Sequence, residues 1–130
     1  MKRLLAVFLG GGFGAISRYG LSALVNRLWS AHVPLGTLAV NILGSLLMGL
    51  IWSLTGPKLD ISPDLKAFIM VGCLGAFTTF STFSLETANL YSRGLYLQAT
   101  LNILLSVIIC LGAAFLGIYL GRSLSAILHI

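Results

Sequence analysis

Long apolar runs separated by short polar connections form the main pattern along this chain. A helix needs about 20 apolar residues to span the hydrocarbon core of a bilayer, and four runs are long enough. These runs cover Leu4–Trp29, Leu35–Thr55, Ala67–Leu90 and Leu97–Leu120. The connections between them leave no room for a soluble domain. The pattern therefore predicts an all-α membrane protein with four transmembrane helices, forming a single domain over residues 1–130.

Composition and charge agree with this prediction. Hydrophobic residues make up 58% of the chain and charged residues 8%, whereas soluble domains have about 45–50% and about 25%. A net charge of +5 would suggest nucleic acid in a soluble protein, but these cations are scattered, and most lie beside the predicted spans as juxtamembrane anchors. On the side of both termini lie Lys2, Arg3, Lys58, Lys66 and Arg122, and on the other side Arg27 and Arg93. The positive-inside rule then modestly favours cytoplasmic termini.

The first run contains a glycine cluster and a cation. Its basic start resembles a signal peptide, but no good cleavage site follows and apolar residues resume after Arg18, so we expect a retained helix. The cluster fits a dinucleotide-binding pattern, yet no strand-then-helix unit surrounds it. Gly10 and Gly14 instead form a small-xxx-small pair that favours close helix packing, as do Gly117 and Gly121. Arg18 either faces a partner or water, or extends to the membrane interface.

The third run is unusually polar between residues 72 and 86. This stretch holds two glycines, five hydroxyl side chains, three phenylalanines and one carboxylate. A membrane tolerates irregular backbone only where the freed N–H and C=O groups are buried in protein or line a wet cavity. The composition therefore predicts a break in the third helix and a functional site beside it.

Polar residues also share one face of the second run. Thr37, Asn41, Gly44 and Ser45 follow at i, i+4, i+7 and i+8, which is helical spacing. A single intramembrane asparagine usually only bridges helices, but its alignment with small and hydroxyl residues favours a pore lining. Ser106 lies four residues after Asn102 in the fourth run, which is a weak signal by itself.

Aromatic residues and an acid accompany the hydroxyl groups of the third run. Phe80 and Phe83 are three residues apart, and ring edges carry partial positive charge that can stabilise a small anion. Such aromatic stripes more often form a packed core. Glu86 is the one carboxylate within the apolar runs and is a functional candidate. The alternative is a structural ion pair between Glu86 and Arg18 or another arginine.

These segments resemble the Fluc (CrcB) family of microbial fluoride channels. The matching pieces are GGFGAISRY (11–19), GTLAVNILGS (36–45) and GCLGAFTTFSTFSLE (72–86), in this order in a four-span chain. The resemblance implies an antiparallel, dual-topology homodimer with two fluoride pores at the subunit interface. It also implies a structural sodium ion (Na+) at the dimer centre, held by backbone carbonyls of Gly75 and Thr78. The charge bias departs from the near-balance that dual insertion favours.

The resemblance also assigns roles to single residues. Phe80 and Phe83 would form an aromatic box for fluoride, Asn41 would donate a hydrogen bond to it, and Arg18 would lie toward the vestibule. The remaining polar lining of the pore would consist of Thr37, Ser81, Thr82, Glu86 and Ser106. Of these transfers, Ser106 rests on position more than on a motif.

The resulting hypothesis is a channel in the cell inner (plasma) membrane that passively exports fluoride from the cytoplasm and protects against its toxicity. One rival is a small proton-coupled efflux transporter, which keeps its acid in the first helix, where this chain has Arg18. A non-transporting assembly subunit would lack the polar stripe. An enzyme is not indicated, because no nucleophile, base and orienting group, or set of metal-ligand side chains, is apparent. Cys73 and Cys110 are expected to be buried free thiols.

Overall fold

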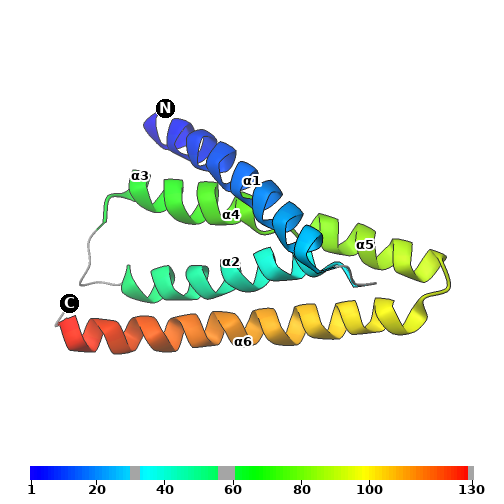
Figure 1. Cartoon of the computed structure of the whole chain (residues 1–130). Helices are drawn as coiled ribbons and strands as arrows, with labels where there is room; N and C mark the ends of the chain where they lie inside the picture. The colour runs from blue at the N-terminus through cyan, green and yellow to red at the C-terminus, as the bar shows by residue number, and fades with distance from the viewer. Residues whose placement is uncertain (30–32, 56–60, 129–130) are drawn as a thin grey trace.

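The computed structural model describes residues 1–29, 33–55 and 61–128, which are almost entirely helical (Figure 1). The elements are α1 (Lys2–Leu28), α2 (Leu35–Leu54), α3 (Pro63–Lys66), the π-helix η1 (Ala67–Leu74), α4 (Gly75–Phe77), α5 (Phe80–Ser92) and α6 (Tyr96–Leu128). Four stretches of this described part are long and apolar enough to cross a membrane, namely α1, α2, the composite Pro63–Ser92 and α6. The prediction of an all-α, multi-pass membrane protein is confirmed.

The observed helices extend beyond the predicted spans where the sequence becomes polar. The fourth helix continues to Leu128 rather than ending at Leu120, through Arg122 and two serines. The third begins at Pro63, after Ser62 accepts a capping hydrogen bond of 3.2 Å from the Leu65 amide. Apolar runs mark only the part of a helix that lipid can cover, so polar turns outside it were missed.

Close glycine contacts hold the helices together. α2 and α6 lie side by side along much of their length, and α1 packs on η1 (Figure 1). A Cβ atom added at Gly10 or Gly14 would collide with the η1 backbone, and one added at Gly117 would collide with the α2 backbone. The predicted small-residue packing is therefore confirmed, and it gives helices in lipid the close approach on which dispersion contacts depend.

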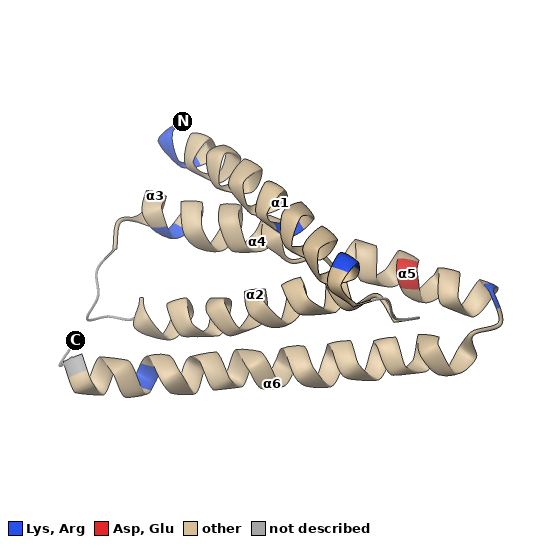
Figure 2. Cartoon of the chain, in the orientation of Figure 1, with Lys and Arg blue, Asp and Glu red and all other residues tan. Residues whose placement is uncertain are grey.

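Basic residues lie at the start of α1, on α3, toward the end of α6 and just after α5, but also farther along α1, and the acidic residue of α5 lies in the middle of that helix (Figure 2). The start of α1 and the end of α6 lie at the same end of the molecule, as an even number of spans requires (Figure 1). At that end Arg3 on α1 lies 3.5 Å from the Asp64 carboxylate on α3, and both side chains are solvent-exposed. Such an exposed pair contributes little stability. Lys58, which was counted at this end from the sequence, lies outside the described residues.

Candidate functional site

The backbone leaves helical geometry at Thr78 and Thr79, between α4 and α5. Thr78 has φ −90° and ψ 156°, and Thr79 has φ −151° and ψ 118°, which are extended conformations. Thr79 is also the N-cap of α5, since its side-chain oxygen accepts a 3.2 Å hydrogen bond from the Thr82 amide. This segment lies in the glycine- and hydroxyl-rich part of the third span. That it acts as a functional break within the bilayer stays a prediction.

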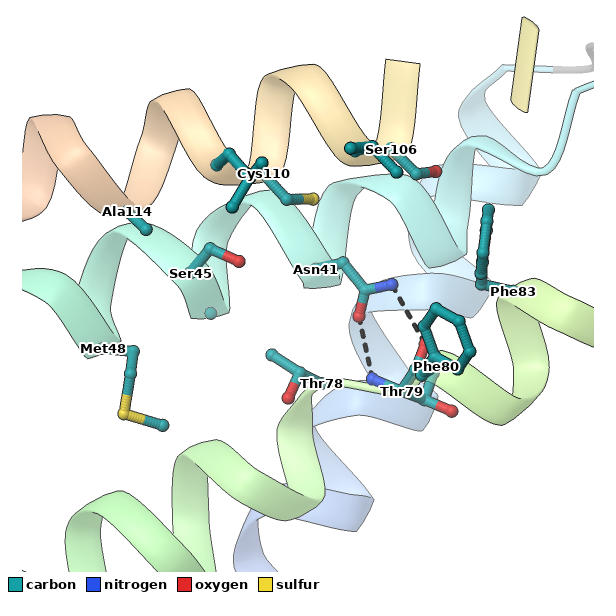
Figure 3. A pocket seen from close by; sticks show the side chains of 13 residues that line it. Asn41, Ser45, Met48, Thr78, Thr79, Phe80, Phe83, Ser106, Cys110 and Ala114 are labelled. Atoms are coloured by element: carbon teal, nitrogen blue, oxygen red, sulfur yellow. Dashed lines mark hydrogen bonds between the residues drawn. The ribbon is translucent and has the colours of Figure 1, made fainter. Parts of the chain in front are cut away.

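Asn41 on α2 supports this extended segment directly. Its Nδ2 donates to the Thr79 carbonyl at 3.0 Å, and its Oδ1 accepts from the Thr79 amide at 2.8 Å (Figure 3). Thr79 is buried. In a bilayer an unpaired backbone group costs several kcal/mol, roughly, so the asparagine amide replaces the bonds that a continuous helix would make. One Nδ2 hydrogen remains for another acceptor.

Two carbonyls, one before the extended segment and one within it, lose their usual helical partners. In an unbroken α-helix the Thr79 amide would bond to Gly75 and the Thr82 amide to Thr78. Here the first donates to Asn41 and the second to the Thr79 hydroxyl. Carbonyl oxygens of this kind are ligands that hard cations accept. That Gly75 and Thr78 hold a cation stays a prediction.

A cavity of about 470 Å³ lies beside the extended segment and is formed by α2, α5 and α6 (Figure 3). The phenyl rings of Phe80 and Phe83 stand at one side with centroids 5.3 Å apart and planes tilted by 49°. Phe80 is 77% exposed and Phe83 only 9%. Apart from these two rings, the lining consists of Asn41, Gly44, Ser45, Met48, Thr78, Thr79, Ser106, Val107, Cys110, Leu111 and Ala114.

The cavity unites some of the residues that the sequence nominated and leaves out others. Asn41, Thr78, Phe80, Phe83 and Ser106 all line it. The remaining nominated residues, which are absent from its lining, are Thr37, Ser81, Thr82, Glu86, Gly75 and Arg18. The helical stripe predicted on α2 therefore divides, with Asn41, Gly44 and Ser45 at the cavity and the threonine elsewhere.

Thr37 and Glu86 form a separate polar pair between α2 and α5. The Thr37 hydroxyl is buried and donates a 2.8 Å hydrogen bond to Glu86 Oε1. Thr37 lies in the first turn of α2, where the helix dipole favours a nearby acid. Among the described residues Glu86 makes no ion pair, so the suggested link to Arg18 is wrong within this chain. Its Oε2 is buried and has no hydrogen-bond partner in the same part.

The other nominated residues lie around the start of α5 and on α1. Thr79 donates a 3.0 Å hydrogen bond to the Thr82 hydroxyl, and the Ser81 hydroxyl is 3.2 Å from the same Thr79 oxygen. Both Ser81 and Thr82 are exposed, as is Gly75, whereas Arg18 is half-buried on α1. The hydroxyls of Thr79, Ser81 and Thr82 form a cluster at the N-terminus of α5, where the first amides of the helix have no partner within the helix.

Sequence reasoning missed three features of the site. It did not assign Thr79, whose main chain rather than side chain pairs with Asn41. It gave no role to Thr87, which contacts the buried Asn102. The i, i+4 spacing of Asn102 and Ser106 was the available signal for the latter contact. Met48 and Cys110 also line the cavity, but they belong to no polar pattern in the sequence that could have placed them there.

These observations define a class: a multi-pass membrane protein in which non-helical backbone of one span lies against a partly polar cavity. The chain matches the family described as CrcB-like protein, Camphor Resistance (CrcB), over residues 5–118. The chain therefore belongs to the CrcB family, as the resemblance predicted.

Curated relatives match nearly the whole chain. Proteins named Fluoride-specific ion channel FluC are 50% identical over 117 residues in Shewanella baltica (90% of this chain and 94% of the relative) and 46% identical over 122 residues in Coxiella burnetii (93% and 98%). One from Magnetococcus marinus is 51% identical over 116 residues, covering 89% and 94%. Each relative is named as an ion channel rather than an enzyme.

Proposed function

We propose that this chain is a fluoride-selective channel that passively exports fluoride from the cytoplasm and protects the cell from it. The names of its relatives support this function. The structural observation that carries the proposal is the extended segment at Thr78 and Thr79, which faces a cavity bearing Asn41 and two phenyl rings. Irregular backbone within a span is tolerated where it lines such a path.

The groups at the cavity suit the chemistry of fluoride. The ion is small and strongly hydrated, so a pore must replace its water with hydrogen-bond donors. Asn41 has one N–H left after bonding Thr79, and Ser106 adds a hydroxyl. The rims of Phe80 and Phe83 add weak positive potential. These groups hold an anion without trapping it, because none is a full positive charge, and conduction requires escape as well as entry.

The residues outside the cavity extend this path in the proposal. Ser81 and Thr82 lie in the first turn of α5, where the helix dipole attracts an anion. The pair of Thr37 and Glu86 would continue the polar track along α5. Arg18 would lie in the aqueous vestibule and raise the local concentration of anions.

A second copy of the chain completes the proposed assembly. The cavity is open, and Phe80 is largely exposed in a single chain, so an antiparallel partner would cover both. Gly75 and Thr78 would each give a carbonyl to a sodium ion at the centre of this dual-topology homodimer. The sodium ion would interact with these carbonyl oxygens in place of the helical amides that no longer bond to them.

The direction of flow follows from the membrane potential. In acidic surroundings fluoride enters cells as neutral HF and dissociates near neutral pH. An inside-negative potential favours exit of the anion by about 2.3 kcal/mol per charge per 100 mV. Placement in the inner (plasma) membrane is therefore part of the proposal, and no coupling ion is required.

Efflux from liposomes tests the proposal. Purified protein is reconstituted into vesicles loaded with potassium fluoride or potassium chloride, and a potassium ionophore sets the voltage. We expect rapid fluoride efflux, no chloride efflux, and weaker fluoride efflux once sodium is replaced and trapped ion removed. Equal chloride efflux would overturn fluoride selectivity, and fluoride efflux driven only by a proton gradient would favour a transporter. Indifference to sodium would overturn the cation site alone.

A further inference from the structure

A polar contact joins α5 to α6 one helical turn away from the cavity. Asn102 Nδ2 donates a 2.8 Å hydrogen bond to Thr87 Oγ1, and this hydroxyl donates in turn to the Phe83 carbonyl oxygen at 2.8 Å. Asn102 is only 1% exposed. An amide buried on an apolar helix costs free energy unless it is hydrogen-bonded, so an apolar side chain would serve better if packing alone mattered.

The contact lies on the shared face of the two helices. Thr87 is four residues after Phe83 on α5, and Asn102 is four residues before Ser106 on α6, so each contact residue lies one turn from a cavity residue. Phe83 and Ser106 are both buried, at 9% and 8% exposure. The Asn102–Thr87 hydrogen bond therefore holds α5 and α6 together one turn away from Phe83 and Ser106, which these helices contribute to the cavity.

Among the described residues, this is the side-chain hydrogen bond that links α5 to α6. The other buried residues on this face, such as Leu90 and Ala99, are apolar, so their contacts lack the directionality of a hydrogen bond. A threonine hydroxyl that bonds the carbonyl four residues earlier also biases the local bend of its helix. Thr87 combines this bond with the cross-helix bond from Asn102.

We infer that Asn102 is a positioning residue, which acts through the Thr87 hydroxyl to fix the Phe83 turn of α5 against α6. The inference rests on the proposed function, because it assigns Asn102 to the placement of one wall of the fluoride path. Asn102 itself does not line the cavity. Its effect on flux is indirect and requires Thr87.

The test compares variants that remove or keep the two hydrogen bonds. Asn102→Leu removes the cross-helix bond, and Thr87→Val removes both bonds, each with little change in volume. Thr87→Ser keeps the hydroxyl and so keeps both. Since displacement by about 1 Å can cost a hundredfold in rate, we expect about tenfold slower fluoride efflux for the first two variants and a rate within about twofold of wild type for the serine. Ser92→Ala is the matched control, because Ser92 is exposed, donates to the Ala88 carbonyl and, within the described part of the chain, has no partner on another helix.

The double variant Asn102→Leu with Thr87→Val separates a relay from two independent packing defects. A relay predicts that the double variant is no slower than either single variant, because residues acting as a unit are not additive. Multiplying effects, or equal loss in Thr87→Ser and Thr87→Val, would overturn the inference. If Asn102→Leu does not elute from gel filtration as wild type does, the valine and serine pair decides. A wild-type protein without fluoride efflux would instead contradict the proposed function.

Discussion

At the scale of single residues, Asn41 combines a structural and a proposed ligand role. Both faces of its amide bond the main chain of Thr79, which leaves one N–H to meet an anion. An asparagine suits this position because it carries a donor and an acceptor side by side. Aspartate would lack the donor, and a hydroxyl residue would not reach both backbone groups at once.

We predict that Asn41→Leu sharply lowers fluoride efflux. Leucine has a similar volume but leaves the Thr79 amide and carbonyl without partners, which costs about 1–3 kcal/mol for each group. The variant also removes the N–H that would replace water around the ion, and a barrier to fluoride higher by about 1.4 kcal/mol would slow efflux from liposomes by about tenfold. Ser53→Ala on the same helix removes a bond to the Leu50 carbonyl and a contact beside Gly121 on α6, but Ser53 does not line the cavity, so efflux should stay unchanged. Efflux of Asn41→Leu equal to that of this control would contradict the role of the asparagine.

The sequence identified side chains better than main-chain partners. Asn41 and Ser106 could be nominated because polar residues are conspicuous at helical spacing in an apolar run. Which group they would meet depends on a neighbouring helix far away in the sequence. The pairing of Asn41 with Thr79, and the absence of a pair between Glu86 and Arg18, could therefore be known only from the structure.

At the scale of elements, α1 and η1 form a closely packed pair before the extended segment. Gly14 faces the Cys73 backbone, where no side-chain atom fits. η1 is a π-helix, a form that often occurs near functional sites. The π-helical geometry of η1 and its contact with α1 together determine the path of the third span up to Thr78.

We predict opposite effects of alanine at two neighbouring glycines. A Cβ at Gly14 would collide with the Cys73 carbonyl, whereas one at Gly12 meets nothing within 4 Å. Overpacking costs about 1–3 kcal/mol, while Gly→Ala inside a helix gains about 1 kcal/mol. The apparent Tm in detergent should therefore fall for Gly14→Ala and stay equal or rise for Gly12→Ala. The same Tm for both variants would show that α1 and η1 are not in close contact.

The elements were easier to predict than their limits and internal form. Runs of apolar residues located all four spans, since lipid requires such runs. They did not reveal that η1 is a π-helix. A π-helix differs from an α-helix by bonding each amide to the carbonyl five rather than four residues earlier, and this difference leaves the composition unchanged. They also missed the Pro63 turn and the last turns of α6, which carry polar residues.

At the scale of the whole molecule, the cavity results from bringing three helices together. α2, α5 and α6 each contribute lining residues, and no pair of these helices encloses the space alone. The sequence could nominate Phe80, Phe83 and Ser106 separately, but only tertiary packing places them on one cavity while Thr37 and Glu86 pair outside it. The central claim is that fluoride passes along this cavity.

The most direct test of this claim is the fluoride efflux rate of Phe80→Ile compared with that of Leu85→Ile. Both residues are exposed on α5, at 77% and 63%, so neither change should disturb the fold of the chain. Of these two residues only Phe80 lines the cavity, where the centroid of its ring lies 5.3 Å from the centroid of the Phe83 ring. The account predicts that Phe80→Ile slows efflux by about tenfold or more, which corresponds to a barrier higher by about 1.4 kcal/mol, and that Leu85→Ile does not. Equal efflux from the two variants would contradict it.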